Sequence, residues 1–130
     1  MGYSTCMAKE KELDGTLKDW ESVFRQGLLT FWTFVALDAE WYDVASLKNR
    51  IKQLTNGTYD PADQTLYRQL RRHLDVGLVE LRLESSPAGP PKKLYRLSER
   101  GRRVLEQFAY RNIQPFSQPE VQNVIERIQT

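Results

Sequence analysis

The change of hydrophobic spacing at Gly77 limits the possible folds of this chain more than any other feature. Before it, leucines recur at every fourth position from Leu66 to Leu74, as on the buried face of a helix. After it, apolar and charged residues alternate from Val79 to Glu84, as in a strand with one buried face. A glycine is well suited to end a helix, so the pattern predicts a helix that passes directly into a strand.

A second alternating segment lies a short distance further along the chain. Residues 85–93, SSPAGPPKK, consist almost entirely of residues that favour turns and loops. From Lys93 to Leu97 the side chains again alternate between two faces. The two segments therefore predict a β-hairpin.

The first third of the chain predicts helices. Thr16 followed by Asp19 resembles a capping box, so a helix is predicted to begin there. Apolar residues then recur at alternating spacings of three and four, and Gly27 is expected to divide the stripe into two helices. Residues 28–37, LLTFWTFVAL, are apolar almost all round, which predicts a central helix buried on several sides.

Two shorter helices are predicted between this central helix and the hairpin. Asp43 is a suitable N-cap for the first, and Asn56-Gly57 supplies its C-terminal stop. Asp60 is predicted to cap the second, with Pro61 at its first position, where the missing N–H costs nothing.

After the hairpin, Ser98 is predicted to cap a fourth helix, which the region of Pro115 and Pro119 must interrupt before a final helix. The order helix, helix, helix, hairpin, helix is that of a winged helix-turn-helix with additional helices at both ends. The predicted fold class is therefore mainly α with a small β-hairpin, within the α+β proteins.

With 130 residues, 40% of them hydrophobic, the chain has the size and composition of one globular domain. Its longest apolar run is too short to cross a bilayer, and its only cysteine, Cys6, cannot form an internal disulfide. We expect a cytoplasmic protein that does not contact membranes. The expected parts are a flexible N-terminus at 1–15, a winged-helix domain at 16–105, and C-terminal dimerisation helices at 106–130.

Positive charge is concentrated in the middle third of the chain. Residues 60–103 hold ten Lys or Arg against six Asp or Glu, whereas the segments on either side are slightly acidic. In the helix predicted at 61–76, Tyr67 and the leucines share the side expected to face the core. The opposite side carries side chains that can donate to base edges and phosphates. They are Gln64, Thr65, Arg68, Gln69, Arg71 and Arg72.

This side predicts a recognition helix for double-stranded DNA. The first turns of such a helix usually meet bases, so we assign Gln64, Thr65 and Arg68 to base contacts. The later turns usually meet the backbone, so Arg71 and Arg72 are assigned to phosphates. A solvated basic face is the less favoured alternative, because the helix follows a predicted helix-turn-helix in the basic part of the chain.

The predicted hairpin carries a second set of cations. Arg82 and Arg96 are expected on the outward faces of its strands, and Lys92 and Lys93 at the rim of its turn. We assign all four to DNA contacts, since cationic side chains follow the negative potential of a minor groove or phosphate ridge. The alternative is that charges on an exposed hairpin prevent edge pairing.

Apolar residues on the outer helices predict a dimer. The final helix carries a narrow apolar stripe that no later element can cover. The residues assigned to the interface between two copies are Leu17, Trp20, Phe24, Phe108, Val121, Val124, Ile125 and Ile128. The tryptophans Trp20, Trp32 and Trp41 are interpreted as core or interface residues, with an apolar pocket for a flat ligand at the dimer seam as the alternative.

The residue types that catalysis would need are missing. His73 is the only histidine, it has no second metal-type ligand at a useful spacing, and there is no glycine-rich phosphate loop. We interpret His73 as a surface residue of its helix. No enzymatic activity, metal or cofactor is expected.

Residues in the middle of the chain form a pattern more specific than any short motif. The segments DPADQTLYRQLRRHLDVGLVE and GPPKKLYRLSERGRRVL contain Pro61, Tyr67, Leu70, Leu74, Gly77, Leu78, Val79, Gly89, Pro90, Pro91, Tyr95, Arg96, Leu97, Gly101 and Arg102 in order. In this order they resemble the PadR-like transcriptional regulators, over roughly residues 28–105. Trp41 departs from that pattern, because the family often has a small residue before the Tyr that corresponds to Tyr42.

The resemblance implies a homodimeric regulator, usually a repressor, that binds an operator with inverted half-sites. It implies that the N- and C-terminal helices form the dimer. The short C-terminal region resembles the compact branch of the family. Among the compact members, the chain is similar to a cyanobacterial regulator of a circadian clock gene, and this similarity implies a clock gene as the target. We therefore expect repression by a nucleoid-associated homodimer. The alternatives are a winged-helix module that binds a protein and a repressor controlled by an aromatic ligand, so a small-molecule effector stays open.

Overall fold

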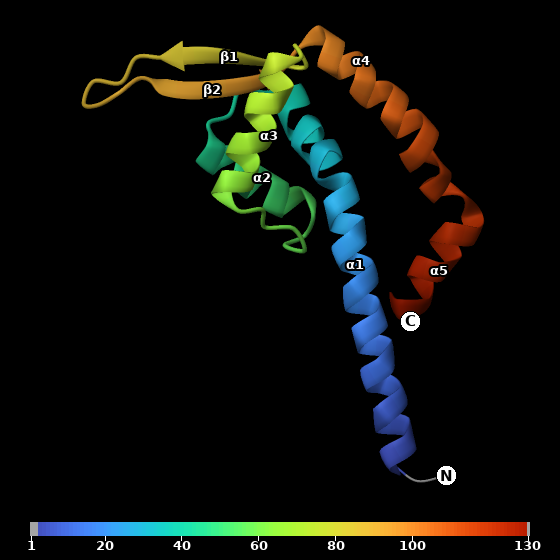
Figure 1. Cartoon of the computed structure of the whole chain (residues 1–130). Coiled ribbons are helices and arrows are strands. Elements are labelled where there is room, and N and C mark those ends of the chain that lie inside the picture. The colour runs from blue at the N-terminus through green and yellow to red at the C-terminus, as the bar shows by residue number, and fades with distance from the viewer. Residues whose placement is uncertain (1–2, 130) are drawn as a thin grey trace.

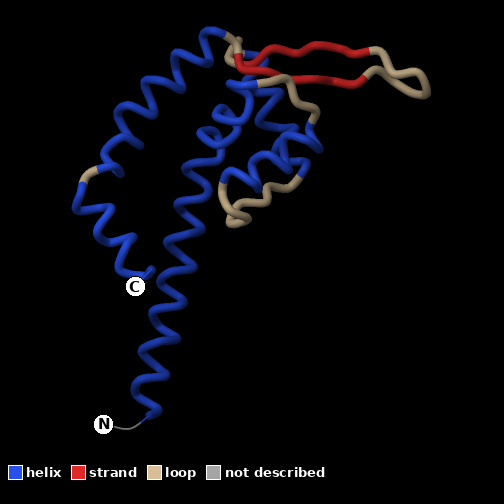
Figure 2. The backbone as a smooth tube through the Cα atoms, turned by 180° about the vertical axis from the view of Figure 1, so that it is seen from behind, coloured by secondary structure: helices blue, strands red, loops and turns tan. Residues whose placement is uncertain are grey.

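The computed structural model describes residues 3–129 and contains mainly helices (Figure 1). A two-stranded antiparallel hairpin projects sideways from them (Figure 2). The fold class predicted from the sequence is confirmed. In chain order the elements are α1 (Tyr3–Ala39), α2 (Val44–Leu54), α3 (Asp63–Asp75), β1 (Val79–Glu84), β2 (Lys92–Leu97), α4 (Glu99–Phe108), a π-helical turn (Ala109–Ile113), a 3-10 turn (Gln114–Ser117) and α5 (Pro119–Gln129).

The first helix is longer and more continuous than the sequence pattern indicated. It begins at Tyr3 rather than Thr16 and passes through Gly27 without a break, so both predictions are wrong. Residues 8–13, AKEKEL, are good helix formers and extend the helix backwards past the capping box. A single glycine costs a helix about 1 kcal/mol but does not end it. Flexibility of residues 1–15 stays a prediction, and residues 1 and 2 lie outside the described part.

The second helix is confirmed, including its cap. The Asp43 carboxylate accepts a hydrogen bond from the Ser46 N–H at 2.8 Å. This bond lowers the pKa of Asp43, and the nearby Lys92 lowers it further. Beyond the helix, Asn56 and Gly57 adopt positive φ angles of 52° and 80°, which is the predicted C-terminal stop.

The third helix starts later than predicted. The backbone stays extended through Ala62, with φ −66° and ψ 147°, and no side chain caps the helix, so the prediction of Asp60 as the N-cap is wrong. The carboxylates of Asp60 and Asp63 instead face Lys48 of α2, with oxygen to Nζ distances of 3.9 and 3.4 Å. The predicted stop at Gly77 is confirmed by its φ of 75°.

The hairpin pairs Leu81 with Tyr95 and continues in register on both sides. Tyr42 adds a short bridge to its open edge, with two backbone hydrogen bonds of 2.9 and 2.8 Å to Tyr95. The prediction that β1 buries one face is wrong beyond Val79, because Leu81 and Leu83 are exposed. The outer part of the hairpin extends past the helices, so no element covers it (Figure 2).

The core lies where α1, α2, α3 and the base of the hairpin meet. Its fully buried side chains come from each of these elements. They are Thr33, Leu37, Leu47, Ile51, Leu66, Leu70 and Leu97. The prediction of a central helix at residues 28–37 is therefore confirmed.

The fourth helix begins as predicted, and its first turn packs closely against Gly77 and Leu78, which precede β1. Ser98 Oγ accepts from the Gly101 N–H at 3.0 Å and donates to the Gly77 carbonyl at 2.7 Å. A Cβ at Gly101 would overlap the Leu78 carbonyl oxygen. After the predicted interruption near Pro115, α5 turns back so that its own C-terminal end lies level with the middle of α1 (Figure 1). Within residues 3–129 no helix combines the length and apolar character that a membrane span needs.

Candidate nucleic-acid interface

One side of α3 is locked against the core. Leu66 and Leu70 are fully buried and Leu74 is half-buried, as predicted. Tyr67 and His73 exchange the positions expected of them, because Tyr67 is 53% exposed and His73 only 7%. The spacing contained the signal, since His73 lies three residues after Leu70 and seven after Leu66, on the same helix face.

His73 packs between α3 and α1. Its ring meets Phe34 edge-on with 4.9 Å between the centroids. Burial lowers the pKa of His73, and the charge of Arg72 lowers it further, so the ring is neutral at physiological pH. Its Nε2 has no hydrogen-bond partner in the part of the chain that the structure describes. His73 therefore contributes to packing and not to a contact surface.

The other side of α3 is open to solvent. Gln64, Arg68, Arg71 and Arg72 are exposed, and Thr65 is half-buried. Among the residues that the structure describes, no ion pair or hydrogen bond engages the three guanidinium groups. Salt bridges hold other cations, such as Lys48 and Arg102, against the body of the protein. The three arginines are therefore available as donors to an external anion.

An open groove of about 660 Å³ separates α3 from the hairpin. Its lining from α3 includes Gln64, Tyr67, Arg68 and Arg71, and its lining from the hairpin consists of Leu81, Lys93 and Tyr95. Burial raises the pKa of Tyr95, with a smaller contribution from Tyr67, so this phenol stays neutral. Asp75 is the only carboxylate in the lining, so positive charge dominates the groove.

The groove brings together only part of the predicted site. Lys93 joins Arg68 and Arg71 there, whereas Thr65 and Arg72 lie outside its lining. Strand register places Arg82 and Arg96 on the opposite face of the hairpin from Leu81 and Tyr95. There, both guanidinium groups stack on the ring of Trp41.

The hairpin of β1 and β2 is the wing of this fold, and two of the four cations predicted on it have carboxylate partners. Arg96 pairs with Glu80 at 3.4 Å, and Lys92 pairs with Asp43 at 3.6 Å. The sequence did not reveal Glu80, Asp43 or Trp41 as partners of these cations. Both Trp41 and Asp43 belong to the connection between α1 and α2, and its approach to the hairpin depends on the tertiary fold.

The residues assigned to a dimer interface are exposed on both outer helices. Leu17, Trp20 and Phe24 of α1 are 53%, 72% and 47% exposed. On α5, Val121 is half-buried, and Val124, Ile125 and Ile128 are exposed. Phe108 is half-buried and packs against Phe31 at 5.7 Å between ring centroids. Within one chain, therefore, most of these apolar side chains remain in water.

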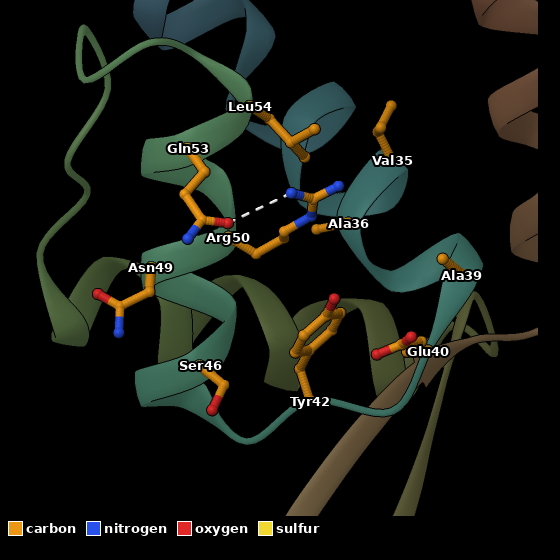
Figure 3. A pocket seen from close by; sticks show the side chains of 10 residues that line it. All are labelled: Val35, Ala36, Ala39, Glu40, Tyr42, Ser46, Asn49, Arg50, Gln53 and Leu54. Carbon is orange, nitrogen blue, oxygen red and sulfur yellow. Dashed lines mark hydrogen bonds between the residues drawn. The ribbon is translucent and has the colours of Figure 1, made fainter.

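The other hollows do not suggest a common aromatic pocket. Trp32 lines a hollow of about 280 Å³ with Phe24 and Tyr59, but Trp20 and Trp41 do not line it. A second groove, between α1 and α2, contains Glu40 and Arg50, and Arg50 donates to Gln53 at 3.2 Å (Figure 3). No group of metal-ligating side chains occurs among the described residues.

Comparison with known proteins connects this arrangement to a family. Residues 38–107 match the model of the transcriptional regulator PadR-like family. This segment contains α2, α3, the hairpin and most of α4. No curated protein matches the chain.

Solved structures share the fold. A PadR family regulator from Eggerthella lenta is 26% identical, with a TM-score of 0.60, over 75% of this chain and 80% of that one. A PadR-like regulator from Bacillus cereus is 21% identical, with a TM-score of 0.58, over 82% and 95%. Bacillus subtilis PadR, solved in complex with operator DNA, is 17% identical, with a TM-score of 0.57, over 62% and 46%. The chain therefore belongs to the PadR-like family of transcriptional regulators and is not an enzyme.

Proposed function

We propose that this protein represses transcription by binding duplex DNA as a homodimer, with α3 in the major groove. The observation that carries the proposal is the outer side of α3, where three arginines have no partner within the described chain. Such side chains match the negative charge and the hydrogen-bond acceptors of a duplex. Bacillus subtilis PadR, which shares the fold, was solved on operator DNA, and this supports the same use of the fold here.

Roles within the interface follow from position along α3. Gln64, Thr65 and Arg68 belong to its first two turns and are proposed to meet base edges. Arg71 and Arg72 come later and are proposed to bind phosphates. Phosphate contacts set orientation and affinity, whereas base contacts set sequence preference.

The wing is proposed to contact the duplex mainly through Lys93. This lysine shares a groove with Arg71, so one DNA backbone segment can lie against both side chains. Lys92 lies beside it at the turn and is a second candidate. Arg82 and Arg96 are less favoured as contacts, because both stack on Trp41.

The homodimer is proposed to form through the outer helices α1 and α5. Exposed apolar side chains on both of them lose contact with water when two copies associate. A two-fold dimer offers two recognition helices to half-sites one helical turn apart, so an inverted repeat is the expected operator. A clock gene as the target stays a prediction of the sequence resemblance.

A salt titration with duplexes selected from a random pool tests this function. Neutralising several phosphates releases counterions, so the logarithm of the affinity must fall linearly with the logarithm of the salt concentration. The proposal expects this steep dependence and an inverted repeat among the selected sequences. Absence of duplex binding at low salt, together with salt-insensitive binding of a protein partner, would instead identify a protein-interaction module.

A further inference from the structure

We infer that Trp41 is a positioning residue of the DNA interface, because it holds the wing at a fixed angle to α3 through Arg82 and Arg96. The inference rests on the proposed DNA-binding function. It gives the two wing arginines a role within the protein in place of contact with the duplex.

The stack joins the hairpin to the connection between α1 and α2. The Cζ atom of Arg82 lies 4.6 Å from the centroid of the Trp41 ring, and that of Arg96 lies 4.5 Å from it. Both distances are well inside the range in which a guanidinium is attracted to the negative face of an indole. The next residue, Tyr42, forms two backbone hydrogen bonds to Tyr95 of β2. The connection between α1 and α2 therefore contacts the hairpin twice, through the Trp41 side chain and through the Tyr42 backbone.

Charge explains why an aromatic ring is needed at this position. Two guanidinium groups on one ring repel each other, and Glu80 compensates only for Arg96, at 3.4 Å. The indole supplies an attractive surface to both cations without adding a carboxylate that would repel phosphates. Trp41 is half-buried, so this attraction is screened by salt less than a fully exposed ion pair.

The position of the stack links it to the interface. Arg82 and Arg96 occupy the face of the hairpin that points away from the groove, and Lys93 occupies the groove face. A hairpin that rocks about its base moves Lys93 relative to Arg68 of α3. Because Trp41 holds the face that carries Arg82 and Arg96, Lys93 stays at a fixed distance from Arg68. Less conformational entropy is then lost when the protein binds DNA.

Duplex affinities of five full-length variants test the inference: W41A, W41F, R82Q, K93A and the double variant W41A/K93A. We expect W41A and R82Q to weaken binding by roughly three- to tenfold with an unchanged salt slope. W41F retains an aromatic face and should recover most of the affinity. In the K93A background W41A should cost nothing further, because Trp41 acts by placing Lys93.

Three results would overturn the inference. One is additivity of W41A and K93A, and another is a salt slope reduced by about one in R82Q, which is expected of a direct phosphate contact. The third is tighter binding by W41A, which would mean that Trp41 withholds the arginines from DNA. Far-UV circular dichroism checks folding, and W41F and R82Q carry the test if W41A does not fold.

Arg50 provides a matched control for charge. It lies in the groove between α1 and α2, whose lining contains no residue of α3 or the hairpin, so R50Q should leave affinity and salt slope unchanged (Figure 3). If the unmodified protein shows no salt-dependent duplex binding, the proposed function fails. If it binds and W41A behaves like it, only the role of Trp41 fails.

Discussion

The imidazole of His73 meets the ring of Phe34 edge-on, with 4.9 Å between the centroids, and so fastens α3 to α1. This contact is made on the side of α3 opposite to its free arginines. The side of α3 that we propose for DNA is therefore held outward by a packed core, in which Leu66 and Leu70 are also fully buried.

Burial of His73 predicts a stability that depends on pH. Burial lowers its pKa from 6.5, so between that value and the lower folded value the unfolded chain binds more protons. The stability that the neutral His73 contributes is therefore fully present above pH 6.5 and is lost as the pH falls from 6.5 toward the lower folded pKa. Urea unfolding at pH 7.5 and pH 5.5 should show a loss of unfolding free energy that is smaller in His73→Leu. An equal loss in both proteins would contradict the neutral, buried His73.

Gly101 predicts an intolerance of even one methyl group. A Cβ there would overlap the Leu78 carbonyl and press on the Leu97 side chain, so Gly101→Ala should lower the unfolding free energy by about 1–3 kcal/mol. Gly27 is the matched control, because it lies in a helix with open space where an added Cβ would point. Gly27→Ala should raise the unfolding free energy by about 0.5–1 kcal/mol. The same shift at both positions in urea titrations would refute this account of the close contact between Gly101 and the Leu78 carbonyl.

The arginines of α3 are predicted to contact different parts of the duplex. Arg68→Ala should cost about 1–3 kcal/mol on the selected duplex and relax the preference at one base pair. Arg72→Ala should weaken all duplexes evenly and reduce the salt slope by about one. Binding measured on a panel of single-base variants at fixed salt separates the two. Identical profiles for both variants would remove the division into base and phosphate contacts.

The apolar side of α5 is predicted to hold two copies together. Ile125→Asp places a carboxylate in the proposed interface, and desolvating it should raise the dimer dissociation constant at least about tenfold. Asn123→Asp adds the same charge at an exposed polar position and serves as the control. Sedimentation equilibrium measures both proteins. A dimer that tolerates both substitutions equally would exclude Ile125 from the interface.

Local signals in the sequence were sufficient for much of the fold. The caps at Asp43 and Ser98 and the stop at Gly77 each depend on residues a few positions away, and all three are confirmed. The start of α1 was predicted wrongly, because a capping box stabilises a helix only where the helix begins. Here the helical backbone continues on the N-terminal side of Thr16.

Long-range contacts explain the remaining differences. Asp60 faces Lys48 of α2 rather than capping α3, and Trp41 meets two arginines that are far from it in sequence. Neither relation can be read from spacing, because each depends on how helices and hairpin pack. The exposed arginine side of α3 was accessible to sequence reasoning, since the regular leucine spacing decides which side faces outward.

Guanine protection in the bound duplex tests the central claim most directly. An arginine that pairs with guanine covers its N7 atom in the major groove, so bound protein should shield specific guanines from dimethyl sulfate. We predict that each half-site contains a shielded guanine and that Arg68→Ala loses this protection while still occupying the duplex. A bound complex in which every guanine N7 stays reactive would contradict the insertion of α3 into the major groove.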